Sequence, residues 1–347
     1  MRSNAPGPEL LRAALHCVRD YLCVSAADNV LITTDTAADT VLIEALQTAL
    51  MLQGARASVL TIPQLPMQGS LADPFIPPAV EGAAERSDVW MDLTFPYIAG
   101  SHAQANAMRQ RPIRYLLCSD LNSEAMTRLF GSCELQSVTD AMAKLYGFFA
   151  AAVGKTLRVT TPSGTDVEFV LAPPELPEPA HISEPGLYML PGASTLIPEL
   201  ESTRGTVVLE TVFHEYYTPL EEPVVLHVDG RIRSFEGGGH QAPLLDRVLR
   251  RAGGGDDYGY IIHFTHGFHP TARVTGNCFV EDMRAEGSNA VGMGLPFWQP
   301  GGGENHPDAV MTRQSIWLEG EQIVHEGVFL GDSALAGKCR SLLPLHR

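Results

Sequence analysis

The sequence of 347 residues lacks several features that would place it in other protein classes. No apolar run approaches the roughly 18–20 residues of a transmembrane helix, so we expect no membrane partner. Residues 1–15 show no apolar stretch ahead of a small-residue cleavage site, and we therefore expect no signal peptide. Basic residues are few, with 24 against 40 acidic ones and a net charge of −16. Because nucleic-acid binding requires cations that neutralise phosphates, this balance disfavours a nucleic-acid partner.

The cysteines also lack any metal-binding pattern. Six of them are scattered along the chain without a CxxC pair or another zinc-type spacing. This distribution is typical of reduced, mostly buried thiols in a reducing compartment. Together with the missing signal peptide, it predicts a soluble, cytoplasmic protein.

Two common catalytic motifs are absent as well. After the first expected strand, residues 33–40 read TTDTAADT where a dinucleotide-binding site would show GxGxxG, which excludes a nicotinamide or flavin cofactor. No GxSxG elbow follows any expected strand, so Ser-His-Asp hydrolysis has little support. Cys278 has no neighbours that would mark it as a catalytic nucleophile.

The chain that remains has the size and composition of an α/β protein with two domains that share a cleft. In the first part, short apolar runs alternate with helical stretches, which predicts an open, doubly wound parallel sheet in a domain of residues 1–153. A helix expected over residues 38–53 ends at Gly54. The four expected strands are residues 29–34, 57–62, 88–93 and 114–118.

The second part, residues 154–347, is predicted to be a mostly β, metal-binding catalytic domain. Turn signals separate three expected hairpins, and helical periodicity returns clearly only at residues 242–251, before a run of glycines. The three hairpins join residues 157–161 to 166–171, residues 224–228 to 231–235, and residues 315–318 to 322–324.

Four of the twelve histidines fall in this second part within two unusual segments. Residues 258–270 read YGYIIHFTHGFHP, a short strand that runs into a Gly-Pro loop. Alternation along the strand puts His263 on the face opposite to its two neighbours, whereas His266 and His269 are expected where strand gives way to loop. Each histidine taken singly is as well explained by a structural role.

The fourth histidine belongs to a His-x-Asp pair. A glycine-rich loop over residues 301–305 leads into His306-Pro307-Asp308. In extended backbone this spacing puts both side chains on one face, as two adjacent positions of a coordination sphere require. The alternative is a turn in which the aspartate bonds to its own backbone. Two imidazoles and a carboxylate suit non-haem Fe(II), and also Zn or Mn, so spacing leaves the metal open.

These motifs resemble those of the thermophilic-type leucyl aminopeptidase superfamily and, within it, the branch of 2,5-dihydroxypyridine 5,6-dioxygenases. The peptidases carry a Gly-x-Asn-Pro turn, of which Gly267 and Pro270 keep the first and last residues. Counting back from this turn puts His263 where the peptidases have a metal-binding glutamate. Their His-x-Asp metal pair matches His306 and Asp308.

The departures from the peptidase pattern favour the dioxygenase branch. Residues 189–194 offer no carboxylate where the peptidases supply a metal-binding glutamate, and residues 288–292 replace a segment with a metal-binding histidine. The resemblance therefore implies one Fe(II) ion held by His263, His306 and Asp308. The alignment leaves His266 and His269 as rivals to His263.

We accordingly expect a mononuclear non-haem iron, extradiol-type dioxygenase. By resemblance it converts 2,5-dihydroxypyridine to N-formylmaleamate, with the heterocycle, O₂ and further copies of the chain as its partners. A metallo-aminopeptidase or related amide hydrolase, and a fold relative without metal, are the alternatives. An acid or base must also move the substrate's protons. The expected candidates are His102, His181, Glu184 and Tyr188.

Overall fold

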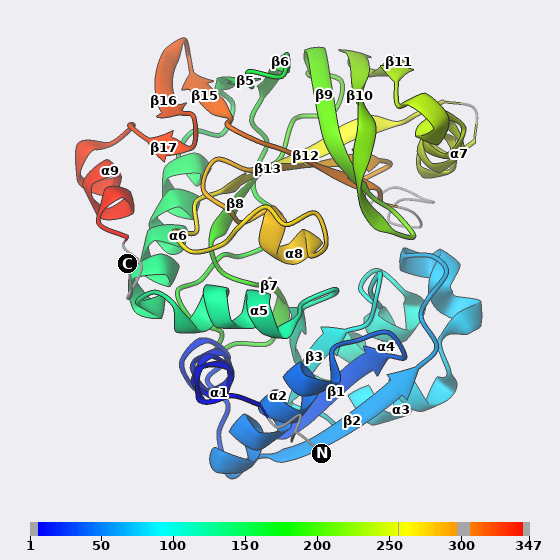
Figure 1. Cartoon of the computed structure of the whole chain (residues 1–347), viewed down its shortest axis with the longest axis vertical. Coiled ribbons are helices and arrows are strands. Elements are labelled where there is room, and N and C mark those ends of the chain that lie inside the picture. Colours follow the sequence, from blue (N-terminus) through cyan, green and yellow to red (C-terminus); the bar gives the residue numbers. More distant parts are fainter. Residues whose placement is uncertain (1–5, 256, 297–305, 343–347) are drawn as a thin grey trace.

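A computed structural model describes residues 6–255, 257–296 and 306–342. Two sheets dominate it, a smaller parallel one and a large, mostly antiparallel one, as Figure 1 shows. The predicted α/β class, with an open parallel sheet followed by a mostly β part, is confirmed. The glycine-rich loop expected over residues 301–305 lies outside the described residues.

The smaller sheet contains the four strands expected from the apolar runs and a fifth from later in the chain. All its pairs are parallel, in the order β2-β1-β3-β4-β7. The order reverses after β2, so right-handed crossovers place the connecting helices on opposite faces of a doubly wound sheet. The strands are β1 (Asn29–Asp35), β2 (Arg56–Ile62), β3 (Val89–Leu93), β4 (Arg114–Leu117) and β7 (Gly186–Met189).

Local capping explains where the helices begin and end. The Asp39 side chain accepts hydrogen bonds from the backbone nitrogens of Val41 and Leu42 at the start of α2, and Gly54 ends that helix with a φ of 76°. The helices are α1 (Pro8–Leu15), α2 (Thr40–Leu52), α3 (Pro78–Ala84), α4 (His102–Gln110), α5 (Ser123–Met126), α6 (Leu135–Ala150), α7 (Ala242–Ala252), α8 (Phe279–Asp282) and α9 (Ser333–Arg340). Turns of π-helix follow α1 and α5 at His16–Tyr21 and Thr127–Gly131, and 3₁₀ turns occupy Gly69–Phe75 and Gly239–Gln241.

The large sheet runs in the order β17-β16-β15-β5-β6-β9-β14-β13-β12-β8, with β10 paired to β9 and β11 paired to β10. The three predicted hairpins are present as β5–β6, β10–β11 and β15–β16. The strands are β5 (Thr156–Thr160), β6 (Asp166–Val170), β8 (Ala193–Leu196), β9 (Arg204–Phe213), β10 (Tyr217–Asp229), β11 (Arg231–Gly237), β12 (Tyr260–Gly267), β13 (Asn289–Gly294), β14 (Asp308–Met311), β15 (Ser315–Leu318), β16 (Glu321–His325) and β17 (Val328–Phe329).

Two expectations about this part of the chain were wrong. Helix α9 and the short α8 accompany α7, whereas one clear helix was expected. Strand β12 extends through His266 to Gly267, because both of its edges are paired, with β13 and with β8. His266 therefore belongs to the strand and not to the loop that follows it.

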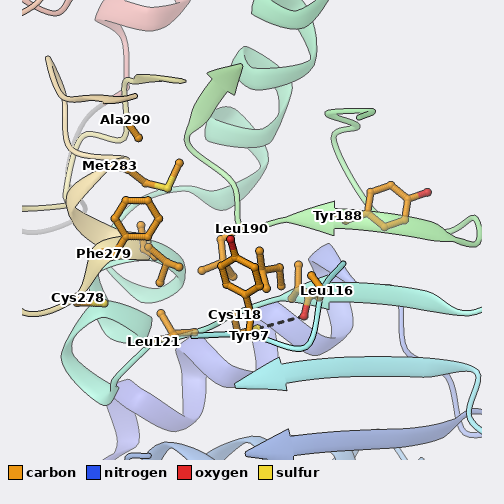
Figure 2. Packing of buried hydrophobic residues seen from close by; sticks show 14 of the residues in the cluster. Tyr97, Leu116, Cys118, Leu121, Tyr188, Leu190, Cys278, Phe279, Met283 and Ala290 are labelled. Atoms are coloured by element: carbon orange, nitrogen blue, oxygen red, sulfur yellow. Dashed lines mark hydrogen bonds between the residues drawn. The ribbon is translucent and has the colours of Figure 1, made fainter. Parts of the chain in front are cut away.

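The two sheets meet across an apolar layer. In Figure 2, Phe279 and Met283 from the α8 segment face Cys118, Leu121 and Leu190, which belong to or follow strands of the smaller sheet. Burial of such side chains stabilises by roughly 1.5–3 kcal/mol each. This contact fixes the carboxyl ends of β3, β4 and β7 against the large sheet. None of the helices in the described ranges has the length and apolar character of a membrane span.

Candidate metal centre and cavity

Three neighbouring strands of the large sheet bring a potential metal site together. His263 lies in β12, Asp308 is the first residue of β14, and His306 precedes that strand by two residues. Between these strands, Gly292 of β13 is in register with both His263 and Asp308. Side chains directly opposite each other in antiparallel strands are close neighbours. The sheet itself therefore completes this trio by bringing His263 to a pair of residues more than forty positions later in the sequence.

The donor atoms converge on a common point. The Nε2 atoms of His263 and His306 are 3.0 Å apart, and Asp308 Oδ1 lies 3.1 Å from the first and 3.6 Å from the second. Each of the three residues offers one ligand atom, and all these atoms lie within 4.8 Å of one another. Within the described ranges, no other set of at least three His, Cys, Asp or Glu groups has this property.

Gly292 leaves the space in which the two rings meet. A Cβ atom at this position would lie 2.2 Å from His263 Nε2 and 2.7 Å from His306 Nε2, closer than real Cβ contacts occur. Only glycine lets both imidazoles face the same point over β13. Residues 288–292 were expected to lack the metal-binding histidine of the peptidases. Gly292, the last of these residues, is a position where no side chain fits.

Hydrogen bonds from outside the trio hold two of its members in place. Thr265 Oγ1 lies 3.2 Å from His263 Nδ1 and 3.3 Å from Thr195 Oγ1. When Nδ1 donates to Thr265, the tautomer of His263 leaves Nε2 with its lone pair toward the other two ligands. On the other side, the backbone nitrogen of His306 donates to Gln68 Oε1 at 3.1 Å.

The electrostatics of the trio suit a cation. Burial lowers the pKa of His306 to about 4, and the neighbouring Asp308 charge opposes this shift only in part. The imidazole is therefore neutral at pH 7, as a metal ligand must be. Asp308 Oδ1 is buried and receives no hydrogen bond of acceptable geometry from the described residues. A buried carboxylate oxygen left in this state is costly unless a cation is present, so the residues fit a divalent metal.

The two rival histidines lie elsewhere. His266 points to the opposite face of β12 from His263, because three residues separate them in a strand, and its Nδ1 contacts Gln314 Nε2 at 2.6 Å. His269 is fully buried, and its Nε2 lies 3.0 Å from the carbonyl oxygen of Leu129. Burial lowers the pKa of each to about 4, so both are neutral. The structure gives each of them a structural partner and keeps both out of the trio.

The structure does not bring the four expected acid–base residues to this trio. His102 begins α4, has a side chain 77% exposed, and pairs with Asp73 at 2.5 Å. His181 and Glu184 are exposed. The Tyr188 hydroxyl donates to the backbone carbonyl of Glu184 at 3.0 Å, and Figure 2 shows this ring apart from the other labelled side chains. None of the four lines the cavity described next.

A cavity of about 460 Å³ opens onto the trio. This volume is in the range of small-molecule sites, roughly 300–1,000 Å³. Its walls combine the trio with residues at the carboxyl ends of β3, β4 and β7, where open α/β sheets bind ligands. Apolar side chains such as Leu187, Met189 and Phe279 form much of its surface. Its position and its walls fit a flat, mostly apolar ligand beside a metal.

Several polar residues of the cavity wall were not predicted from the sequence. Glu178 and Glu175 come from the proline-rich segment between β6 and β7, and Tyr97 follows β3. Burial raises the pKa of Glu178 to about 7, although a 2.7 Å hydrogen bond from the Thr195 backbone nitrogen favours its charged form. Its Oε2 is buried without a hydrogen-bond partner among the described residues. A carboxyl with these properties in a cavity wall is a candidate acid or base.

A model of the 2,5-dihydroxypyridine 5,6-dioxygenase family matches residues 16–331 of the chain. Among solved structures, the chain is similar to 2,5-dihydroxypyridine dioxygenase from Pseudomonas putida KT2440, with 18% identity, a TM-score of 0.72, and 94% of this chain and 99% of that one covered. It is also similar to wild-type AmpT from Thermus thermophilus, with 12% identity, a TM-score of 0.63, and coverage of 93% and 99%. No curated protein matches the sequence. At such identities the two structures establish the fold alone.

Proposed function

Because the chain belongs to the 2,5-dihydroxypyridine 5,6-dioxygenase family, we propose that it is an Fe(II)-dependent enzyme that opens a dihydroxypyridine ring with O₂. The product of cleavage between C5 and C6 of 2,5-dihydroxypyridine would be N-formylmaleamate. The observation that carries this proposal is the convergence of His263, His306 and Asp308 at the wall of a cavity sized for a small aromatic ligand.

These three residues would hold the iron through two imidazole nitrogens and one carboxylate oxygen. Iron in such a site supplies open coordination positions and the electrons that allow O₂ to react with an aromatic ring. The protein's own contribution is to orient the ring. Phe279, Leu187 and Met189 would exclude water from its faces, and the trio forms part of the same cavity wall.

Glu178 is our proposal for the residue that handles the substrate's protons. A ring hydroxyl must lose its proton for the ring to become electron-rich, and an ionised carboxylate in the cavity wall can accept it. A base works best when its pKa lies near the operating pH, and burial brings the pKa of Glu178 to about 7. The exposed Glu184 lacks this environment, as does His102.

Iron content tests the ligand assignment. Wild-type protein reconstituted anaerobically with Fe(II) should retain about one iron per chain, and His306→Ala or Asp308→Ala should retain almost none while keeping the wild-type circular dichroism spectrum. His240→Ala is the control, because that side chain is 67% exposed and pairs with Glu221. Wild-type iron occupancy in both ligand variants would refute the assignment.

A further inference from the structure

Arg284 lies in the wall of the cavity and is only 1% exposed. Its Nε and Nη2 atoms each donate to the carbonyl oxygen of Leu190 at 3.0 Å, and its Nη1 donates to the carbonyl oxygen of Val280. No carboxylate within the described ranges forms an ion pair with it. Its direct hydrogen-bond partners are therefore neutral carbonyl groups.

This arrangement is costly, because a buried charge normally requires a counter-charge. Burial lowers the pKa of Arg284 only to about 10, so the side chain stays charged at neutral pH. The carboxylates of Asp120 and Glu178 act on the guanidinium electrostatically, but the hydrogen bonds seen for both come from other groups. Asp120 accepts from the backbone nitrogens of Phe279 and Val280, and Glu178 accepts from Thr195. Neither carboxylate neutralises the guanidinium by direct contact.

The contacts of Arg284 also leave it donors to spare. The hydrogen bonds above use one N–H of each nitrogen, so Nη1 and Nη2 each keep a second N–H. A planar guanidinium with two free N–H groups matches the two oxygens of a carboxylate. If Arg284 served only to connect the carbonyls of Leu190 and Val280, it would need neither the two free N–H groups nor a position in the cavity wall.

The volume of the cavity also favours a ligand larger than a single ring. A volume of about 460 Å³ is that of a site for a drug-sized ligand. A single dihydroxypyridine ring at the trio leaves part of this space unfilled. Arg284 places a buried cation in the wall of the same cavity, so a ligand larger than the unsubstituted ring and bearing a negative charge would complement it.

We propose that Arg284 binds a carboxylate of the substrate, and that the substrate class is a hydroxylated pyridine bearing an acidic substituent. The inference rests on the proposed ring-cleaving function, which it deepens by naming the substrate group that Arg284 recognises. The trio acts on the hydroxylated ring, and Arg284 selects for the anion and sets the ring's orientation. Arg284 is thus a specificity-determining residue.

Ligand binding to the wild-type, metal-free chain tests the substrate class without turnover. Calorimetry compares 2,5-dihydroxypyridine bearing a ring carboxylate at C3 or C4 with the matching carboxamides and with the unsubstituted ring. We expect at least one carboxylate to bind about tenfold or more tightly than its carboxamide, as charge-assisted bidentate hydrogen bonds imply. Equal affinities for every acid and its amide would overturn the proposal.

Variants then assign the preference to Arg284. Arg284→Gln should abolish the difference between acid and amide, and Arg284→Lys should keep part of it, because it retains charge without the planar fork. Arg114→Gln is the control, since Arg114 is also largely buried, bonds to the carbonyls of Leu22 and Cys23 and pairs with Asp28 at 2.8 Å, but lies outside the cavity wall. A preference that survives in folded Arg284→Gln would refute the assignment. If that variant does not fold, Arg284→Lys and the wild-type comparison still decide.

The outcomes separate this inference from the function on which it rests. Turnover of the unsubstituted ring together with equal binding of acid and amide would refute the anion site at Arg284 and still support the dioxygenase function. Tight, Arg284-dependent binding of the acid without any Fe(II)- and O₂-dependent ring opening would support the anion site and refute the dioxygenase function.

Discussion

The side-chain oxygen of Gln68 accepts a hydrogen bond from the backbone nitrogen of His306 at 3.1 Å, joining segments that are 238 residues apart. The same oxygen accepts from the Tyr97 hydroxyl at 2.8 Å. Gln68 follows β2 and Tyr97 follows β3, so both belong to loops at the carboxyl edge of the smaller sheet. Loops of the smaller sheet therefore hold a candidate metal ligand that lies beside the large sheet.

Replacing Gln68 should weaken both the fold and the metal site. Gln68→Ala leaves the Tyr97 hydroxyl and the His306 backbone nitrogen buried without their acceptor, which costs roughly 1–3 kcal/mol in free energy of unfolding. Iron affinity should fall about 10–100-fold, the usual effect of removing a group that orients a ligand. Urea unfolding and Fe(II) titration measure the two effects. Gln136→Ala, on the exposed face of α6, should change neither, and unchanged iron affinity in Gln68→Ala would argue against an orienting role.

Gly292 offers a more local test of the site's geometry. In Gly292→Ala the added Cβ would collide with the Nε2 atoms of His263 and His306, so the rings must turn away from each other. We expect at least a tenfold loss of iron affinity, comparable to the effect of losing an orienting contact. Gly147→Ala is the control, because a Cβ there meets nothing within 4 Å and alanine favours the helix α6. If Gly292→Ala bound iron as tightly as wild type, His263, His306 and Asp308 would not form the metal site.

The pKa of Glu178 predicts a pH profile. Burial raises this pKa from its ordinary value of 4.5 to about 7, so the carboxyl is mostly protonated below pH 7 and ionised above it. A base must be ionised, and kcat/KM for ring opening should therefore rise as pH increases through about 7. Glu178→Gln should lower kcat/KM about 10²–10⁴-fold and remove this step, whereas the exposed Glu168→Gln should retain it. A step of the same midpoint in Glu178→Gln would assign it to another group.

Local sequence patterns were sufficient for the smaller sheet. The apolar runs at β1 to β4 are bounded by turn residues, and the predicted ends agree with the structure to within one residue. The fifth strand, β7, was missed because Gly186–Met189 is short and follows a proline-rich segment that carries no periodic signal. It joins the sheet through its partner β4, a contact that no local window contains.

The trio was predictable because its members lie in two recognisable sequence motifs, HFTHGFHP and His306-Pro307-Asp308. Its roles as ligands remain a prediction, although the structure brings the three donors together. Glu178, Gln68 and Arg284 could not be found in the same way. A glutamate in a proline-rich segment looks like a solvated loop residue, and its pKa is raised only by its burial in the folded chain.

The fate of dioxygen tests the proposed dioxygenase function most directly. The Fe(II)-loaded enzyme should consume about one O₂ per dihydroxypyridine ring opened, and with isotopically labelled O₂ both labelled atoms should appear in the ring-opened product. No ring should open without O₂ or without Fe(II). If the pyridine stayed intact while amino-acid amides were cleaved anaerobically with Zn²⁺ or Co²⁺, the protein would be a hydrolase and the account would be contradicted.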